Sequence, residues 1–323
     1  MEIIKLRHPY KKSQISQENV VLALGFFDGV HRGHQEVINR AKQLAVDNNY
    51  KLAVMTFNQH PSIVFKKIAV EDMLYLSTTE KKESIMASLG VDILYEIEFT
   101  SSFASLVPQS FVDLYIVDLN AKIVVAGFDY TYGKKEIASM EHLPQYSKER
   151  FEIVVIEKQT TNDSKISSTR IRKAIDSGDI QEANRLLGYT YETTGRVIHG
   201  DARGRLLGFP TANINVTKDI RLPVVGVYVV EILIGNIRYQ GMASIGHNIT
   251  FEASRPLTVE VYILDFDQDI YGEKVSVYWL HYLRDEWKFD SIEALIAQLK
   301  DDEKNTRQFF LENKSLKKLN AKQ

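Results

Sequence analysis

Two histidines, His31 and His34, lie three residues apart in the stretch GFFDGVHRGH (residues 25–34), between an apolar segment and a helical pattern. Three glycines in this stretch permit tight turns and a close approach of the backbone to a ligand. A helix beginning near Gln35 would direct its first N–H groups and the positive end of its dipole to the same place. Two imidazoles on that first turn can donate hydrogen bonds to phosphate oxygens, so the stretch indicates a phosphate site.

Two other interpretations of the histidine pair stay open. One is a zinc site, but no third histidine or carboxylate stands at a diagnostic spacing. The other is a capped turn that carries two exposed histidines. Phosphate binding is favoured because a second stretch offers related chemistry.

The second stretch is SSTRIR (residues 167–172), which follows an apolar segment and opens another helical pattern. Its hydroxyls, its helix N–H groups and its guanidinium fork all suit a polyphosphate. Taken alone, it is more typical of a serine-capped helix with surface arginines. Because both stretches follow predicted strands, the pair indicates a nucleotide site more specifically than either one does.

The two stretches resemble the HxGH and SSTxxR motifs of the HxGH nucleotidyltransferases. Matches at Thr56-Phe57, His60-Pro61 and Gly127-Phe128-Asp129-Tyr130 narrow the resemblance to the FMN adenylyltransferase domain of bacterial bifunctional FAD synthetases. The resemblance implies that the histidines stabilise the transferring α-phosphate and that the SSTRIR segment holds the outgoing pyrophosphate. The residues so implied are His31, His34 and Arg172 for catalysis, Gly25, Phe27, Gly33, Ser168 and Thr169 for ATP, and His60 and Asp129 for the flavin.

A second candidate site lies in GRVIHG (residues 195–200) and GRLLGFPTAN (residues 204–213). Glycines such as Gly204 and Gly208 would let backbone N–H groups wrap a phosphate. Thr211 and Asn213 offer oxygen ligands for Mg²⁺, and strand alternation puts them on one face. A glycine-rich hairpin followed by a polar strand is the plainer interpretation of the same residues.

This second region resembles the GRxLGFPTAN signature of riboflavin kinases, as do Val259-Glu260-Val261 and Asp269-Ile270-Tyr271-Gly272 further on. The resemblance implies that Glu260 accepts the proton of the riboflavin 5′-hydroxyl while Mg²⁺ neutralises charge on ATP. Two departures from the family pattern stand out. Ile249-Thr250-Phe251-Glu252 replaces Pro-Thr-Phe-Gly, and Glu136-Ile137-Ala138 replaces an Arg-x-Gly segment.

The order of predicted elements divides the chain into two halves. Apolar runs at 20–25, 51–57, 91–99, 121–128 and 151–158 alternate with helical patterns, which predicts a doubly wound parallel sheet of Rossmann-like type. Runs at 226–234, 237–245, 258–266 and 275–283 follow one another without helices, which predicts an antiparallel barrel closed by a helix near residue 292. We expect a domain of residues 1–185 and a second domain of residues 186–323.

Composition limits the class of protein. Cysteine is absent, which excludes disulfides, thiol catalysis and cysteine-ligated zinc. The net charge of −2 gives no basic field for nucleic acid or an acidic membrane. The sequence has neither a signal-peptide pattern nor an apolar run of about 18 residues. We therefore expect a cytoplasmic protein that binds neither nucleic acid nor membrane.

The resemblance covers the chain to about residue 310 and implies a bifunctional enzyme. Its C-terminal domain would phosphorylate riboflavin with ATP to FMN, and its N-terminal domain would adenylate FMN to FAD, both with Mg²⁺. Three alternatives stay open: an adenylyltransferase with a weak or silent kinase domain, a non-catalytic flavin-binding regulator, and adenylyl transfer to another phosphorylated acceptor.

Overall fold

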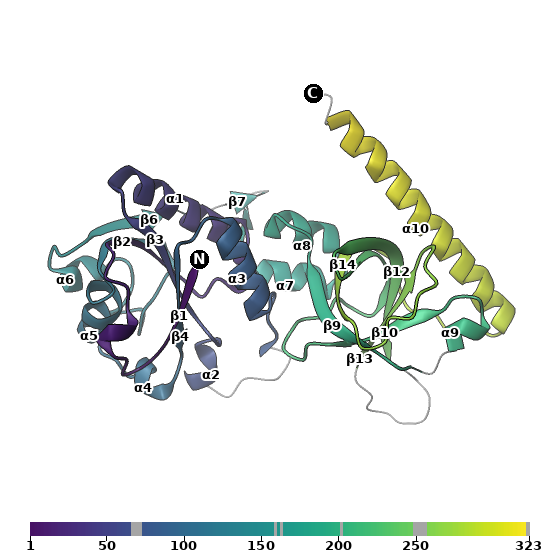
Figure 1. The fold of residues 1–323 in the computed structure, drawn as a ribbon, viewed down its shortest axis with the longest axis horizontal. Helices are drawn as coiled ribbons and strands as arrows, with labels where there is room; N and C mark the ends of the chain where they lie inside the picture. Colours follow the sequence, from purple (N-terminus) through teal and green to yellow (C-terminus); the bar gives the residue numbers. More distant parts are fainter. Residues whose placement is uncertain (66–72, 158–159, 162–163, 201–202, 248–256, 321–323) are drawn as a thin grey trace. The chain divides into compact units, whose positions relative to one another are not determined.

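The computed structural model describes residues 1–65, 73–157, 160–161, 164–200, 203–247 and 257–320. The chain divides into two compact units, Met1–Arg170 and Ile171–Gln323 (Figure 1). No described helix is both long enough and apolar enough to cross a membrane.

The first unit is built on a six-stranded sheet in which all neighbouring strands are parallel, in the order β1-β4-β3-β2-β5-β6. The strands are β1 (Glu2–Arg7), β2 (Val20–Leu24), β3 (Lys51–Phe57), β4 (Ile93–Glu98), β5 (Ala121–Gly127) and β6 (Glu152–Ile156). Five of the six were predicted from their apolar runs. The edge strand β1 was missed because polar and apolar residues are mixed in it, so it has no continuous apolar run. Most of its residues are exposed.

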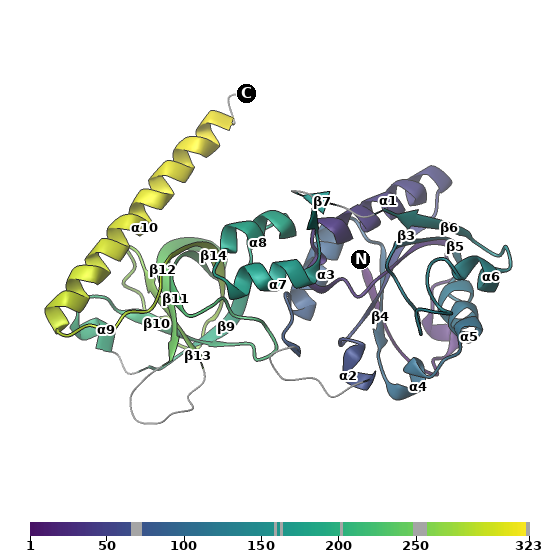
Figure 2. The same ribbon diagram turned by 180° about the vertical axis from the view of Figure 1, so that it is seen from behind.

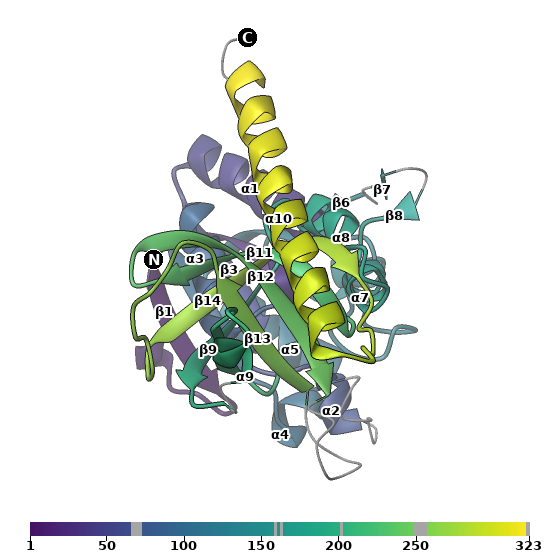
Figure 3. The ribbon, with the colours of Figure 1, turned by 90° about the vertical axis from the view of Figure 1, so that its right-hand side faces the viewer.

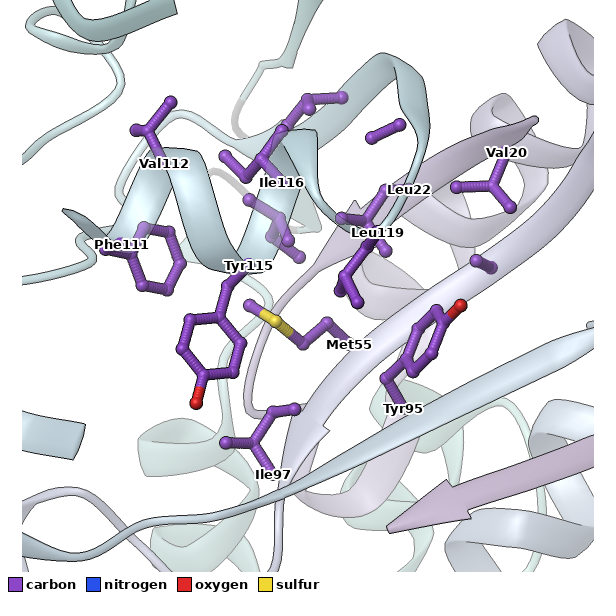
Figure 4. Close-up of a cluster of buried hydrophobic side chains, with 14 of the residues drawn as sticks. Val20, Leu22, Met55, Tyr95, Ile97, Phe111, Val112, Tyr115, Ile116 and Leu119 are labelled. Atoms are coloured by element: carbon purple, nitrogen blue, oxygen red, sulfur yellow. The ribbon is translucent and has the colours of Figure 1, made fainter. Parts of the chain in front are cut away.

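Helices cover both faces of this sheet, which confirms the doubly wound prediction. On one face, the apolar stripe of α1 (Arg32–Asn48) and Met86 of α3 (Thr79–Ser88) pack on alternate residues of the inner strands. On the other face, α5 (Pro108–Val112) and the π-helical turn Asp113–Val117 place Phe111 and Tyr115 in one buried cluster with Met55 (Figure 4). The remaining short elements are η1 (Lys12–Gln14), η2 (Asp28–Val30), α2 (Ser62–Phe65), α4 (Ser101–Ala104), α6 (Leu143–Ser147) and the hairpin of β7 (Thr160–Thr161) and β8 (Ser164–Lys165).

Two predicted helix starts are corrected by the structure. Helix α1 begins at Arg32 rather than near Gln35, because the side chain of His31 caps it. Helix α3 is capped by Thr78, whose Oγ1 accepts from the backbone N–H of Lys81 at 3.1 Å. The spacing of Ser77 and Glu80 is that of a capping box and predicts Ser77 as the cap, but the Ser77 hydroxyl accepts from the N–H of Gly29 instead, at 3.2 Å.

The second unit contains a closed antiparallel barrel with the strand order β10-β13-β12-β11-β14-β9. Its strands are β9 (Glu192–Ile198), β10 (Thr211–Val216), β11 (Gly226–Ile234), β12 (Ile237–His247), β13 (Leu257–Ile263) and β14 (Lys274–Arg284). Gly235-Asn236 is a two-residue hairpin signal in the sequence, and the structure confirms it, since Ile234 pairs with Ile237 and Gly235 adopts a φ of +58°. Because the barrel is closed, each of its described strands is paired on both sides.

Helices flank the barrel. Helix α10 (Ile292–Asn320) contacts β12 and runs past the strands (Figure 3). The sequence offers Asp290 and Ser291 as caps, and Ser291 is the cap, since its hydroxyl accepts from the N–H of Ala294 at 3.1 Å. The spacing of Ile292, Leu295, Ile296 and Leu299 predicts one apolar stripe, but Ile292 is 62% exposed because it is the first helical residue and lies outside the packed turns. The other helices are α7 (Ser168–Asp176), α8 (Ile180–Leu187) and α9 (Arg203–Leu206).

Helix α8 is joined to the barrel by both packing and hydrogen bonds (Figure 2). The Asn184 side chain donates to the Trp279 carbonyl at 2.9 Å and accepts from the Tyr191 N–H at 2.6 Å. Ile180 and Ala183 of α8 are fully buried. The stretch 171–185 therefore packs with the barrel, although the expected domain boundary would separate the two.

This packing generates a prediction about isolated fragments. A fragment of residues 186–323 lacks Asn184 and Ile180, so it should be less stable than a fragment of residues 171–323 by about 3 kcal/mol. Urea denaturation followed by circular dichroism measures the difference. Equal midpoints for two cooperatively folded fragments would show that the boundary at 185/186 is sufficient.

Candidate active sites

A pocket of about 440 Å³ lies in the first unit, at the carboxyl ends of the sheet strands. Its walls come from the segments that follow β2, β3, β5 and β6 and from the start of α1. Doubly wound sheets bind ligands at this edge, because the loops that leave parallel strands converge there. Of the residues expected in the first site, those lining the pocket are Gly25, Phe27, His31, Gly33, His34, His60, Asp129 and Ser168. Thr169 and Arg172 are not among its lining residues.

The two histidines form a stacked pair at the start of α1. Their ring centroids are 3.6 Å apart with an interplanar angle of 15°. The Nδ1 of His31 accepts a hydrogen bond from the backbone N–H of His34 at 3.3 Å. Since Nδ1 is the acceptor, the proton of a neutral His31 resides on Nε2, which can donate to a ligand. His31 is only 5% exposed, and the cap therefore fixes its ring.

His34 is held in its neutral form. Burial lowers its pKa well below 6.5, and the charges of a protonated His31, of Lys82 and of Lys165 lower the pKa further. Its Nδ1 is buried and has no hydrogen-bond partner within the part of the chain that the structure describes. Two neutral rings can stack closely, whereas two imidazolium rings at 3.6 Å would repel each other.

The glycines of the first stretch make room for side chains of the same stretch. A Cβ on Gly25 would lie 2.7 Å from the ring of Phe27, and one on Gly33 would lie 3.3 Å from the ring of His31. Gly29 has a φ of +73°, which favours glycine. The sequence predicted that these glycines let the backbone approach a ligand. In the structure, Gly25 and Gly33 instead make room for the side chains of Phe27 and His31.

The SSTRIR segment joins the pocket through its first residues. Ser168 donates a hydrogen bond from its hydroxyl to the carbonyl of Asp28 at 3.2 Å, and Ser167 accepts from the Arg170 N–H at 3.3 Å. Thr169 is exposed on α7. Arg172 lies further along the same helix, within the second compact unit. Its assignment to the pyrophosphate site stays a prediction.

Lys165 is a site residue that the sequence reasoning missed. It forms an ion pair with Asp129, and its Nζ lies 4.9 Å from the centroid of the Phe128 ring. Among the described residues that line the pocket, Lys165 is the only lysine or arginine. Its position two residues before the SST motif was a signal, but an isolated lysine is usually a solvated surface residue.

His60, which the family resemblance implies to be a flavin-binding residue, follows β3. Its ring meets Phe26 edge-on at 5.0 Å, and its Nδ1 accepts from the Ser62 N–H at 3.1 Å. Aromatic rings at this wall are suited to a planar heterocycle. The role of His60 in binding a flavin stays a prediction.

In the second unit, three expected residues share one face of neighbouring strands. Asn213 of β10 lies directly opposite Glu260 of β13. Thr211, two residues from Asn213, donates from its Oγ1 to Oε2 of Glu260 at 3.1 Å. Strand alternation and register therefore bring a hydroxyl, an amide and a carboxylate together, as the sequence predicted for the first two.

The glycine-rich turn before β10 is tightly folded. A Cβ on Gly204 would lie 2.3 Å from the carbonyl oxygen of Phe209. The N–H of Phe209 donates to the carbonyl oxygen of Gly204 at 2.8 Å, which closes the turn. Gly208 has a φ of +84° and open space around its Cα. A Cβ on Gly200 would collide with the side chain of Asn213 at 2.3 Å. These glycines let the turn approach the Thr211–Asn213 face.

Two pockets of the second unit meet at Thr211. One, of about 370 Å³, is lined by Glu260 and by apolar and aromatic residues including Trp287, Phe289 and Leu295. The other, of about 410 Å³, is lined by Arg205, Tyr271 and the segment that follows β13. Thr211 is the expected site residue that lines both. The altered segment 249–252 lies outside the described residues.

Comparison with known proteins identifies the family. The family described as FAD synthetase matches residues 13–170, and the family described as riboflavin kinase matches residues 187–310. The chain is 51% identical to the bifunctional riboflavin kinase/FMN adenylyltransferase of Listeria monocytogenes over 96% of this chain and 98% of that protein. Identity to the Bacillus subtilis protein of the same name is 41%, over 96% and 98%. The chain belongs to the bifunctional riboflavin kinase/FMN adenylyltransferase family.

A solved structure from Streptococcus pneumoniae has the same fold as this family member. Its TM-score is 0.86 with 41% identity, and the match covers 94% of this chain and 99% of that one. Its title describes a macrolide-efflux protein. The family assignment rests on the two family matches and the curated relatives.

The interpretation of the histidine pair as a zinc site needs a third ligand. Within the described ranges, no three histidine, aspartate or glutamate side chains gather where they could hold an ion. In the riboflavin kinase region, the oxygen atoms of Thr211, Asn213 and Glu260 are of the type that Mg²⁺ prefers when nucleotide phosphates supply further ligands.

The environment of His34 generates a prediction for NMR titration. A lowered pKa means that the ring should stay neutral at pH 6.5, where an exposed histidine is about half protonated. Because the unfolded chain then binds more protons than the folded one, stability should fall as the pH drops below 6.5. Ring ¹⁵N shifts measure the titration, and the His34→Gln variant assigns the signal. A midpoint at or above 6.5 would contradict the buried, neutral ring.

Proposed function

We propose that this chain makes FAD from riboflavin in two steps, one in each half of the sequence. Residues 186–323 transfer the γ-phosphoryl group of ATP to the riboflavin 5′-hydroxyl, which yields FMN and ADP. Residues 1–185 join FMN to the adenylyl group of ATP with release of pyrophosphate. The family membership over 96% of the chain supports both steps, and the cytoplasm is the expected compartment.

One observation carries the kinase proposal: Thr211 lines both pockets of the second unit and bonds to Glu260. The pocket with Trp287 and Phe289 suits the planar, apolar ring of riboflavin, and the neighbouring pocket receives ATP. The 5′-hydroxyl and the γ-phosphate would then meet beside Glu260. Its carboxylate accepts the hydroxyl proton as the oxygen forms its bond to phosphorus and ADP leaves.

Mg²⁺ belongs to this proposal as part of the ATP substrate. Thr211 and Asn213 would hold it through a hydroxyl and an amide oxygen, and Gly204 and Gly208 would let the turn follow the phosphates. When bound, Mg²⁺ neutralises charge on the phosphates.

The stacked histidine pair carries the adenylyltransferase proposal. A phosphate oxygen of FMN attacks the α-phosphorus of ATP, and the bond to pyrophosphate breaks. The Nε2–H of His31 and the neutral ring of His34 donate to the α-phosphate oxygens, where negative charge develops. Gly25, Phe27 and Gly33 shape the ATP side of the pocket, and Ser168, Thr169 and Arg172 hold the pyrophosphate.

The flavin side of that pocket is proposed to involve His60, Asp129 and Lys165. His60 and Phe26 offer a ring edge and face to the isoalloxazine. Lys165 offers its ammonium to a phosphate, in exchange for its present ion pair with Asp129.

A single assay tests the proposal as a whole. The purified full-length chain is incubated with riboflavin, Mg²⁺ and ATP, and the flavins are separated by chromatography. Formation of FMN and then FAD is expected. FAD formed only from supplied FMN would show a silent kinase region, and flavin binding without turnover would show a regulator.

The first site predicts the effect of His34→Ala. Loss of one preorganised donor should lower the rate of FMN adenylation by about 10²–10³. Riboflavin phosphorylation, which uses the other region, should stay at the parent rate and serves as the internal control. Stoichiometric zinc in the parent, with adenylation lost to a zinc-selective chelator, would instead support a metal site.

The second site predicts the converse for Glu260→Gln. Glutamine keeps the size of the side chain but cannot accept the proton, so kcat for FMN formation should fall by about 10²–10⁴. KM for riboflavin should change far less, because the lost interaction acts mainly as charge moves. Glu273→Gln, at an exposed position before β14, is the matched control. Parental kinase activity in Glu260→Gln would remove this residue from the mechanism.

A further inference from the structure

Lys82 is a buried lysine that none of the roles above uses. It lies on α3 and is 8% exposed. Its Nζ donates to the Phe26 carbonyl at 3.2 Å, to Thr56 Oγ1 at 3.4 Å and to the Phe57 carbonyl at 3.5 Å. It also lies 4.8 Å from the centroid of the Phe26 ring. Lysine is almost never buried unless its charge is compensated, so this arrangement calls for a specific reason.

The acceptors of Lys82 lie at the carboxyl ends of two neighbouring strands. Phe57 is the last residue of β3, and Phe26 follows the end of β2. Thr56 Oγ1 also donates to the Phe26 carbonyl, at 2.7 Å, so the two strand ends and the ammonium form one hydrogen-bonded group. Phe26 and Phe57 line the 440 Å³ pocket, whereas Lys82 itself does not. Lys82 therefore contacts the outer side of the residues that form the pocket wall.

The hydrogen-bond acceptors of Lys82 are neutral oxygens. Lys82 forms none of the ion pairs found among the described residues. Burial lowers its pKa from 10.5, while the more distant charges of Asp28, Glu96 and Glu83 raise it. The same ammonium is among the charges that lower the pKa of His34, together with His31 and Lys165. Its field thus reaches the histidine pair.

We propose that Lys82 is a positioning residue of the adenylylation site, where it ties the ends of β2 and β3 together and supplies a fixed positive charge near the histidine pair. It acts through the Phe26 and Phe57 backbone, which sets the pocket wall, and through His34, which stays neutral and able to donate. Neutral imidazoles need a neighbouring positive field when a polyphosphate enters, since the anion would otherwise favour their protonation. The proposal rests on the adenylyltransferase function proposed for the first unit.

Two substitutions separate the effect of the Lys82 charge from the effect of its hydrogen bonds to the ends of β2 and β3. Lys82→Met removes the charge but keeps much of the side-chain volume, and Lys82→Arg keeps the charge in a different shape. Lys51→Met, at the exposed opposite end of β3, is the matched control. Each variant is assayed as the full chain for FMN adenylation across pH, with riboflavin phosphorylation as the internal control.

We expect Lys82→Met to lower kcat/KM for adenylation by about 10–10², because small displacements at a reacting centre have effects of this size. The acid limb of the pH–rate profile of Lys82→Met should move to higher pH, because the variant lacks the neighbouring positive charge that opposes protonation of His34. Lys82→Arg should lose rate while its acid limb stays at the parental pH. Lys51→Met should match the parent in both. An unchanged rate in Lys82→Met, or a lower rate with an unmoved acid limb, would overturn the proposal.

A readout without turnover keeps this test independent of the proposed function. The ¹⁵N titration of His34 in Lys82→Met should move to higher pH than in the parent, while in Lys82→Arg it should not. If the parent makes no FAD but His34 shifts as expected, the adenylyltransferase proposal fails and the charge relation stands. If Lys82→Met does not fold, an upward shift of the His34 titration in the folded Lys82→Arg would overturn the role of charge.

Discussion

The hydrogen bond from the His34 N–H to the His31 Nδ1 organises the first site. It starts α1, selects the Nε2–H form of a neutral His31, and brings the two rings into a stack with centroids 3.6 Å apart. The stack tolerates no second positive charge, and burial keeps His34 neutral. The start of the helix, the tautomer of a neutral His31 and the stacking of the two rings are thus consequences of one capping interaction.

The second site is assembled by a different constraint, the register of the barrel strands. Asn213 faces Glu260 because β10 and β13 pair at that residue, and Thr211 reaches the same carboxylate from two residues away. A shift of β10 by one residue would turn Thr211 and Asn213 to the face opposite Glu260. Closure of the barrel protects this register, since each strand is held on both sides. The glycine turn at Gly204 then brings backbone close to the assembled face.

Charge is distributed differently in the walls and the surroundings of the first pocket. Lys165 is the only described lysine or arginine that lines it, and Asp129 already engages that lysine. Lys82 lies behind the wall, bonded to neutral oxygens at the ends of β2 and β3. In the role that we propose for Lys82, its buried charge acts on His34 through the interior, where screening by water is weak.

The sequence by itself determined the two types of fold, five of the six parallel strands, the hairpin at Gly235-Asn236 and the motifs that contribute His31, His34, Thr211 and Glu260, because apolar periodicity and local motifs are properties of neighbouring residues. The sequence pattern misplaced the start of α1. Histidine is not a typical capping residue, so the role of His31 is visible only in the structure, where its Nδ1 accepts from the His34 N–H. Only the tertiary structure decided that Lys82 is buried beneath two strand ends, that Lys165 pairs with Asp129, and that Thr211 joins two pockets. Burial and pairing depend on residues distant in the chain, which no local pattern records.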